Sequence, residues 1–64
     1  MNHVLISELE ERIKHNTREI QELRQQLDRT DSEAQREALR KSIDDLTRSS
    51  ARAEFQIQQL GSTD

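Results

Sequence analysis

The sequence of 64 residues contains no cysteine, proline, tryptophan or tyrosine, and it has one glycine and one phenylalanine. Without cysteine there is no disulfide framework and no thiolate zinc site, which suits a reducing compartment, with the cytoplasm as the default. The scarcity of aromatic residues and of glycine, with 36% charged residues, is typical of long helices and coiled coils and excludes a β-fold. The apolar run from Val4 to Ile6 is too short for a signal peptide or a membrane span, so we expect no membrane association.

The sequence does contain apolar side chains at alternating spacings of three and four residues, in two separate segments. This spacing predicts two helices, each with one apolar stripe. The second stripe is displaced by two residues in its heptad phase, a slip that a single straight helix does not accommodate. We therefore expect an all-α antiparallel two-helix hairpin, in which the facing stripe residues have numbers that sum to 66. The pairs are Ile6 with Leu60, Leu9 with Ile57, Ile13 with Ala53, Asn16 with Ser50, Ile20 with Leu46, Leu23 with Ile43, and Leu27 with Leu39.

The pattern also predicts the bounds of the elements within a single domain, residues 1–64. We expect a first helix over about 4–28, a turn over about 29–32, a second helix over about 32–60 and a tail over 61–64. Gly61 follows the last stripe residue, where a left-handed C-terminal cap is expected, followed by a frayed tail over 62–64.

The start of the second helix has two candidate capping boxes. Thr30 with Glu33, and Ser32 with Gln35, both have the spacing at which an N-cap hydroxyl and a side chain three residues later bond to each other's backbone. The pattern leaves the choice between them open.

Asn16 facing Ser50 is the one polar layer in the predicted seam. A slip by one heptad would place Asn16 against Ile43 and Arg36 against Leu23, so the polar layer penalises that alignment. We interpret the layer as a device that fixes the register of the two helices. A ligand-binding role is disfavoured because a two-helix seam has no cavity around the side chain.

A hairpin of this size buries little apolar surface, so we expect it to associate. One flank of the seam, which we call the charged face, consists of Glu10, Thr17, Arg24, Arg40, Thr47 and Glu54. Within one hairpin Glu10 lies near Glu54 and Arg24 near Arg40, whereas a second antiparallel copy sets acid against base. We therefore expect a homodimer that forms a four-helix bundle. The opposite flank, which we call the serine face, is a second contact face and consists of Arg12, Glu19, Gln26, Ser42, Ser49 and Gln56.

Three large apolar residues near the ends of the two predicted helices lie off the predicted seam. Val4, Leu5 and Phe55 are all placed at the open end of the hairpin, and Phe55 occupies the position farthest from the seam. Exposed apolar residues outside a core mark contact sites. We expect these three residues to contribute to self-association or to binding of a protein partner.

No group of residues has the chemistry of a catalytic, cofactor or metal site. Glu11, His15 and Glu19 share one helix face, but this spacing of carboxylates and imidazole is ordinary on a solvated helix surface. The other carboxylates alternate with arginines, as in salt-bridged helix surfaces, and there is no phosphate-binding loop and no nucleophile beside a base. We expect a non-enzyme without a cofactor.

Nucleic-acid binding is not favoured by the charge of the chain. The net charge is −3 and the pI is near 5.3, whereas binding to a phosphate backbone depends on clustered cations. A dimer could still gather a basic stripe, although acidic residues lie on the same faces. The candidate contacts to nucleic acid are Lys14, Arg18, Lys41, Arg48 and Arg52.

Several residues around the turn and in the second helix resemble the Rop family of plasmid RNA-binding regulators. The similar motifs cover about half of the chain and are Leu27-Asp28, Glu37-x-Leu39 and Asp44-x-Leu46-x-Arg48-Ser49. The resemblance implies an antiparallel dimeric four-helix bundle and an RNA partner. In the first helix, the aromatic and amide side chains of the family's RNA-contacting face are replaced by Glu8, Arg12, Asn16 and Leu23, so the resemblance assigns no RNA contact.

The sequence thus predicts a small, non-enzymatic helical interaction module, a regulator or inhibitor that binds and occludes a protein partner. Two alternatives stay open: an RNA-binding adaptor similar to Rop, and a small co-chaperone of a secretion or assembly subunit. A small ligand held between chains is also compatible with the sequence.

Overall fold

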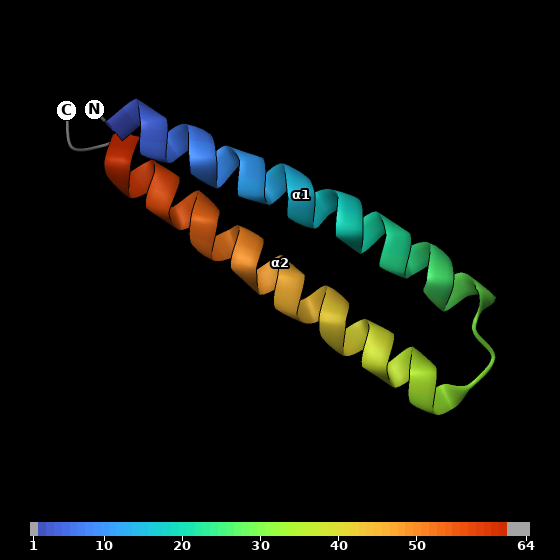
Figure 1. Ribbon diagram of the computed structural model, residues 1–64. Coiled ribbons are helices and arrows are strands. Elements are labelled where there is room, and N and C mark those ends of the chain that lie inside the picture. Colours follow the sequence, from blue (N-terminus) through green and yellow to red (C-terminus); the bar gives the residue numbers. More distant parts are fainter. Residues whose placement is uncertain (1, 62–64) are drawn as a thin grey trace.

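The computed structural model describes residues 2–61, with side chains from residue 3 onward, and these residues form two helices joined by a short turn (Figure 1). Helix α1 spans Asn2–Arg29 and helix α2 spans Glu33–Gly61. The helices lie side by side and antiparallel, with the start of α1 and the end of α2 at one end of the molecule and the turn at the other. The described residues contain no strand. The predicted all-α hairpin is confirmed.

The turn uses one of the two predicted capping pairs. The Ser32 hydroxyl accepts a hydrogen bond from the backbone N–H of Gln35 at 3.4 Å, so Ser32 is the N-cap of α2. Thr30 follows α1 and does not cap α2, because its hydroxyl donates to the Gln26 carbonyl of α1 at 2.6 Å. This hydrogen bond occupies one of the carbonyls that the end of α1 leaves without a backbone donor.

Arg36, in the first turn of α2, forms side-chain hydrogen bonds to the backbone at the end of α1. Its Nη1 atom donates to the carbonyls of Leu27 at 3.0 Å and Thr30 at 3.2 Å. Leu27 is in the last turn of α1 and Thr30 follows directly after the helix, where a cation is also favoured by the helix dipole. The numbers 30 and 36 sum to 66, so the Thr30–Arg36 contact continues the predicted layers into the turn. The sequence pattern had not indicated this role for Arg36.

The predicted left-handed cap at Gly61 is wrong. Gly61 lies within α2, and no described glycine has a positive φ. A left-handed cap is usually accompanied by an apolar contact from the residue after the glycine, and that residue here is the polar Ser62. The tail predicted over 62–64 lies outside the described residues.

The hairpin is long and thin, with Cα extents of 50 × 14 × 10 Å. Its radius of gyration is 14.8 Å, compared with about 11 Å for a compact domain of this length. Its accessible surface is 5298 Å², compared with about 4,250 Å² for a compact monomer of its mass. Over the described residues, neither helix is both long and apolar enough to cross a bilayer.

We predict that Arg36→Ala lowers the free energy of unfolding by about 1 kcal/mol, because two carbonyls at the end of α1 lose a charged donor. For a domain of this size this loss corresponds to a decrease in Tm of about 4–8 °C. Circular dichroism during thermal and urea unfolding measures both values. Arg18→Ala, at an exposed site on the outer side of α1, is the matched control and should change stability by less than about 0.5 kcal/mol. Equal stability of the two variants would contradict the role of Arg36.

Candidate interaction surfaces

The residues of the seam alternate between two heptad positions, a and d, in each helix. All of them are buried or half-buried. The a positions are Ile6, Ile13, Ile20 and Leu27 in α1, and Arg36, Ile43, Ser50 and Ile57 in α2. The d positions are Leu9, Asn16 and Leu23 in α1, Thr30 just after its end, and Leu39, Leu46, Ala53 and Leu60 in α2.

The two sides of the seam differ in burial. The three buried residues, Leu9, Asn16 and Ala53, are all at d positions, whereas every residue at an a position is only half-buried. Residues four apart lie side by side on a helix, so Ile6 is next to Glu10 and the a positions adjoin the charged face. The same rule places the d positions beside the serine face. The charged face therefore borders the more open side of the apolar stripe.

The polar layer in the middle of the seam contains three residues. Asn16 Nδ2 donates to the Ser50 Oγ at 3.2 Å and to the Ser49 Oγ at 3.3 Å. Asn16 is only 5% exposed, and among the described residues no buried side-chain nitrogen or oxygen lacks a hydrogen-bond partner. The pair Asn16–Ser50 follows the predicted register. The contact to Ser49 was not predicted, although its position next to Ser50 in the sequence was a usable signal.

The charged face keeps its two kinds of charge at opposite ends of the hairpin. Glu10 and Glu54 are exposed near the open end, and Arg24 and Arg40 are exposed near the turn. The ion pairs of the described residues are all within one helix, as between Arg40 and Glu33 at 3.8 Å. The acidic end and the basic end of this face are thus not neutralised across the seam.

The centre of the charged face is uncharged. Thr17 and Thr47 each donate their hydroxyl to a carbonyl four residues earlier in the same helix, Ile13 and Ile43, at 2.8 Å. Both hydroxyl protons are therefore already hydrogen-bonded. Covering the two threonines leaves no unsatisfied donor, which removes the main cost of burying a hydroxyl.

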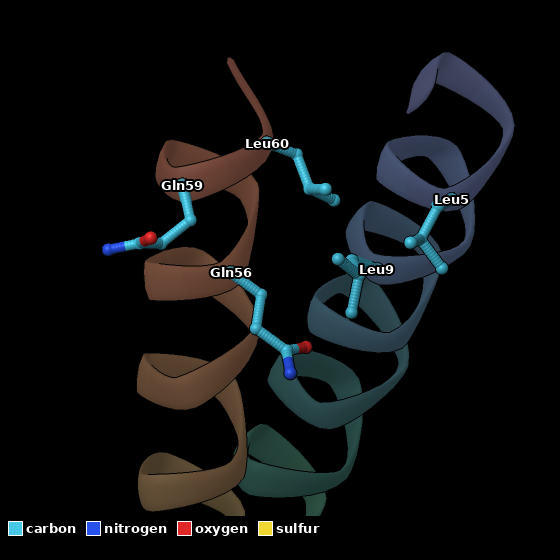
Figure 2. Close-up of a pocket in the computed structure, with 5 residues that line it drawn as sticks. All are labelled: Leu5, Leu9, Gln56, Gln59 and Leu60. Atoms are coloured by element: carbon cyan, nitrogen blue, oxygen red, sulfur yellow. The ribbon is translucent and has the colours of Figure 1, made fainter. Parts of the chain in front are cut away.

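The serine face carries a hollow at the open end of the hairpin, with a volume of about 250 Å³. Figure 2 shows Leu9 and Leu60 pointing toward each other from the two helices, with Leu5 beside them on α1. Gln56 extends toward α1, and Gln59 points away from it (Figure 2). The hollow therefore has an apolar floor and an amide rim.

A second hollow lies on the same face near the turn and has a volume of about 350 Å³. Its lining combines two apolar side chains with amides and a hydroxyl. The lining residues are Gln26, Thr30, Gln35, Ala38 and Leu39. Leu5 and Gln35 occupy the same heptad position as the six residues of the serine face, so both hollows belong to that face.

The hairpin separates the three exposed apolar residues. Val4, Leu5 and Phe55 are 59%, 48% and 60% exposed. Leu5 lines the open-end hollow, whereas Val4 and Phe55 occupy the heptad position opposite the seam in α1 and α2. In two helices packed through their seams, these positions lie on opposite outer edges. The three residues thus belong to three different surfaces.

The candidate nucleic-acid residues are all exposed, but, like Val4 and Phe55, they are divided between the outer surfaces of the two helices. Arg18 in α1 and Lys41 and Arg48 in α2 occupy the outer position of their helix, on opposite edges of the hairpin. Arg48 forms an ion pair with Asp44 at 3.1 Å. The single hairpin does not join these residues into one basic stripe.

The candidate metal and acid–base residues lie on the outer surface. His15 Nε2 is 3.3 Å from Glu19 Oε1, and both side chains are largely exposed. No group of three or more His, Cys, Asp or Glu residues within residues 2–61 is arranged to hold a metal ion.

Comparison with models of protein families finds no match for the chain. Searches of curated proteins and of solved structures find none either.

We predict that Asn16 and Ser50 are energetically coupled. In a double-mutant cycle with Asn16→Ala and Ser50→Ala, the coupling should be roughly 0.5–1.5 kcal/mol, because each single change already breaks the shared hydrogen bond. The same cycle with Ser49→Ala tests the second acceptor. Urea unfolding of each variant gives the free energies. Ser42→Ala is the control, because Ser42 lies on the same face one heptad away, and additive effects of all three serines would contradict the polar layer.

Proposed function

We propose that this protein is a non-catalytic interaction module that acts as an antiparallel homodimer and occludes a surface of a protein partner. The observation that supports the proposal best is the half-buried stripe at the a positions beside the charged face. Isoleucines that are only half-buried along one line mark a surface that another helix pair can cover. Two hairpins packed through their charged faces form a four-helix bundle with these residues inside.

The area of the hairpin is consistent with such a dimer. Two separate hairpins expose twice 5298 Å². A compact protein of about 15 kDa exposes about 7,000 Å², so compact pairing would bury roughly 3,500 Å² in total. Obligate homodimers bury about 2,000–5,000 Å². The surface left open by the hairpin is therefore sufficient for a stable dimer.

The charges favour one orientation of the two copies. With a two-fold axis near Thr17 and Thr47, α1 lies antiparallel to α1 of the second copy, and Glu10 of each faces Arg24 of the other. In α2, Glu54 faces Arg40 of the second copy in the same way. A parallel arrangement would instead place acid against acid at one end and base against base at the other.

Occlusion of a partner is the mechanism that fits two exposed apolar side chains on a charged helical surface. In the dimer, Val4 and Phe55 stay outside the bundle because they lie opposite the seam, and both are more than half exposed. Aromatic side chains are common anchors of protein interfaces, and Phe55 is the only one in this chain. We propose Phe55 and, on the opposite outer edge, Val4 as two separate contacts to a protein partner, which would make the protein a regulator or inhibitor that acts by binding.

The dimer is tested by charge reversal. At low salt and low micromolar concentration, where the charged face pairs first, we expect Glu10→Arg/Glu54→Arg and Arg24→Glu/Arg40→Glu to be monomeric when each is alone. An equimolar mixture should recover the mass of a dimer. Light scattering at about 50 mM and about 500 mM salt measures the mass. Glu11→Arg/Glu22→Arg makes the same change of charge outside the charged face and should stay dimeric. A wild-type mass of 7.5 kDa at micromolar concentrations would contradict the proposal.

The partner class is tested with the purified protein. The chain has no tryptophan or tyrosine and absorbs little at 280 nm, so bound nucleic acid is conspicuous at 260 nm. We expect the purified protein to show no such absorbance. Proteins that bind to the immobilised wild type should be retained at least fivefold less by Phe55→Ser. The control Gln25→Ser, at another exposed site, should retain them like the wild type. Retained RNA that is released at high salt would instead favour the adaptor similar to Rop. Equal retention by both variants would contradict the role of Phe55.

A further inference from the structure

The two hollows of the serine face are placed symmetrically along the hairpin. On α1 the open-end hollow is lined at Leu5 and Leu9, and the turn-end hollow at Gln26 and Thr30. The midpoint between these pairs falls at residues 17 and 18, next to the layer in which Asn16 contacts Ser49. A two-fold axis through this layer therefore places the open-end hollow of one hairpin over the turn-end hollow of another.

We propose that the serine face binds a second copy of the chain in this antiparallel arrangement. The contact goes beyond the dimer proposed above, because it uses the opposite side of the hairpin. Each of its main features follows from residues that the structure places on the serine face.

Leu5 is the apolar residue that joins the two copies. It is 48% exposed and lies beside the open-end hollow, so the two-fold axis sets it opposite Gln26 and Thr30 of the other copy. There it enters the turn-end hollow, whose volume is about 350 Å³, and covers Leu39. The symmetry makes this insertion reciprocal, with one leucine at each end of the contact. The contact thereby removes both the exposed Leu5 and the half-buried Leu39 from water.

The residues between the two hollows are complementary under the same axis. Arg12 faces Glu19 of the other copy, and the Glu19 side chain is 47% exposed beside His15, so it stays accessible to the guanidinium. On α2, the axis passes next to the Asn16–Ser50 layer, so Ser49 faces Ser49 of the other copy. Small side chains at the crossing allow two helices to approach closely. Apolar, charged and small residues thus each find a matching partner in a second copy of the same chain.

The arrangement has a consequence for assembly. The charged face and the serine face lie on opposite sides of one hairpin, so each hairpin can use both at once. Because the two contact faces point in opposite directions, two hairpins that pair through one face still leave the other face of each hairpin open to a further copy. Dimers joined through their serine faces therefore stack into longer assemblies whose mean mass rises with concentration.

Cross-linking tests the contact. The chain has no cysteine, so introduced thiols are the only ones present. In Leu5→Cys/Gln26→Cys the two thiols are 21 residues apart on one helix, about 31 Å, and cannot form a disulfide within the chain. The control is Val4→Cys/Gln25→Cys, which has the same spacing on the outer side of the helix. All four sites are exposed, and circular dichroism verifies that each variant keeps its helices.

We expect mild oxidation at micromolar concentration to link at least fivefold more chain in Leu5→Cys/Gln26→Cys than in the control, as measured on a non-reducing gel. Equal linkage in the two variants overturns the proposal. Glu10→Cys/Arg24→Cys reports separately on the charged face, with about 21 Å between its thiols along the helix. If only that variant forms cross-links, the dimer stands and the serine-face contact fails. If neither variant forms them, both proposals fail.

A second readout uses single charges. Leu5→Glu places a carboxylate in the contact, so we expect light scattering to show a mass that stays at or below that of a dimer at every concentration. Val4→Glu adds the same charge one residue away, outside the face, and should keep the concentration-dependent increase of the wild type. If the mean mass no longer rises with concentration in either variant, the loss is due to the added net charge, and the proposal is overturned.

Discussion

Each helix of this protein carries a single apolar stripe, and a hairpin can cover such a stripe from one direction only. Leu9 and Ala53, at d positions, are buried, whereas the isoleucines at the a positions keep one side in water. Most of the stability of a short helix comes from packing of this stripe. The folded hairpin therefore retains an apolar line along its length. This line connects the fold to the proposed function, because a second pair of helices is the structure that covers it.

Polar residues determine which of several similar seams is formed. Apolar layers of isoleucine and leucine tolerate a slip by one heptad, since the exchanged side chains are alike. Asn16 does not tolerate it, because its amide donates to Ser49 and Ser50 and a slip would set it against an isoleucine. Arg36 has the same effect at the turn, where it is bonded to two carbonyls at the end of α1. The register is thus fixed at the middle and at one end by hydrogen bonds, and the apolar layers supply the burial.

Residue spacing was sufficient to predict the elements and the seam, because alternating intervals of three and four have one interpretation on a helix. It was not sufficient at the ends of the helices. Gly61 fits a left-handed cap by its position, yet its conformation depends on contacts of the residues around it. Arg36 is an ordinary surface residue in a pattern of charges, and its role appears only when the turn brings it back to the end of α1. The hollows were unpredictable for a similar reason. The open-end hollow lies between residues at opposite ends of the sequence, such as Leu9 and Gln56, and the turn-end hollow between residues that face each other across the turn.

The two faces of the hairpin would associate by different physics. The charged face is held together by acidic and basic residues that stay exposed to water, so its contribution is screened by salt and acts mainly on orientation and on the rate of encounter. The serine face relies on a leucine entering a hollow, and burial of apolar surface is insensitive to moderate salt. At low concentration and low salt the charged face would pair first, because charges act over a longer range than contact. A thin hairpin with one such face on each side can therefore form its assemblies in a defined order.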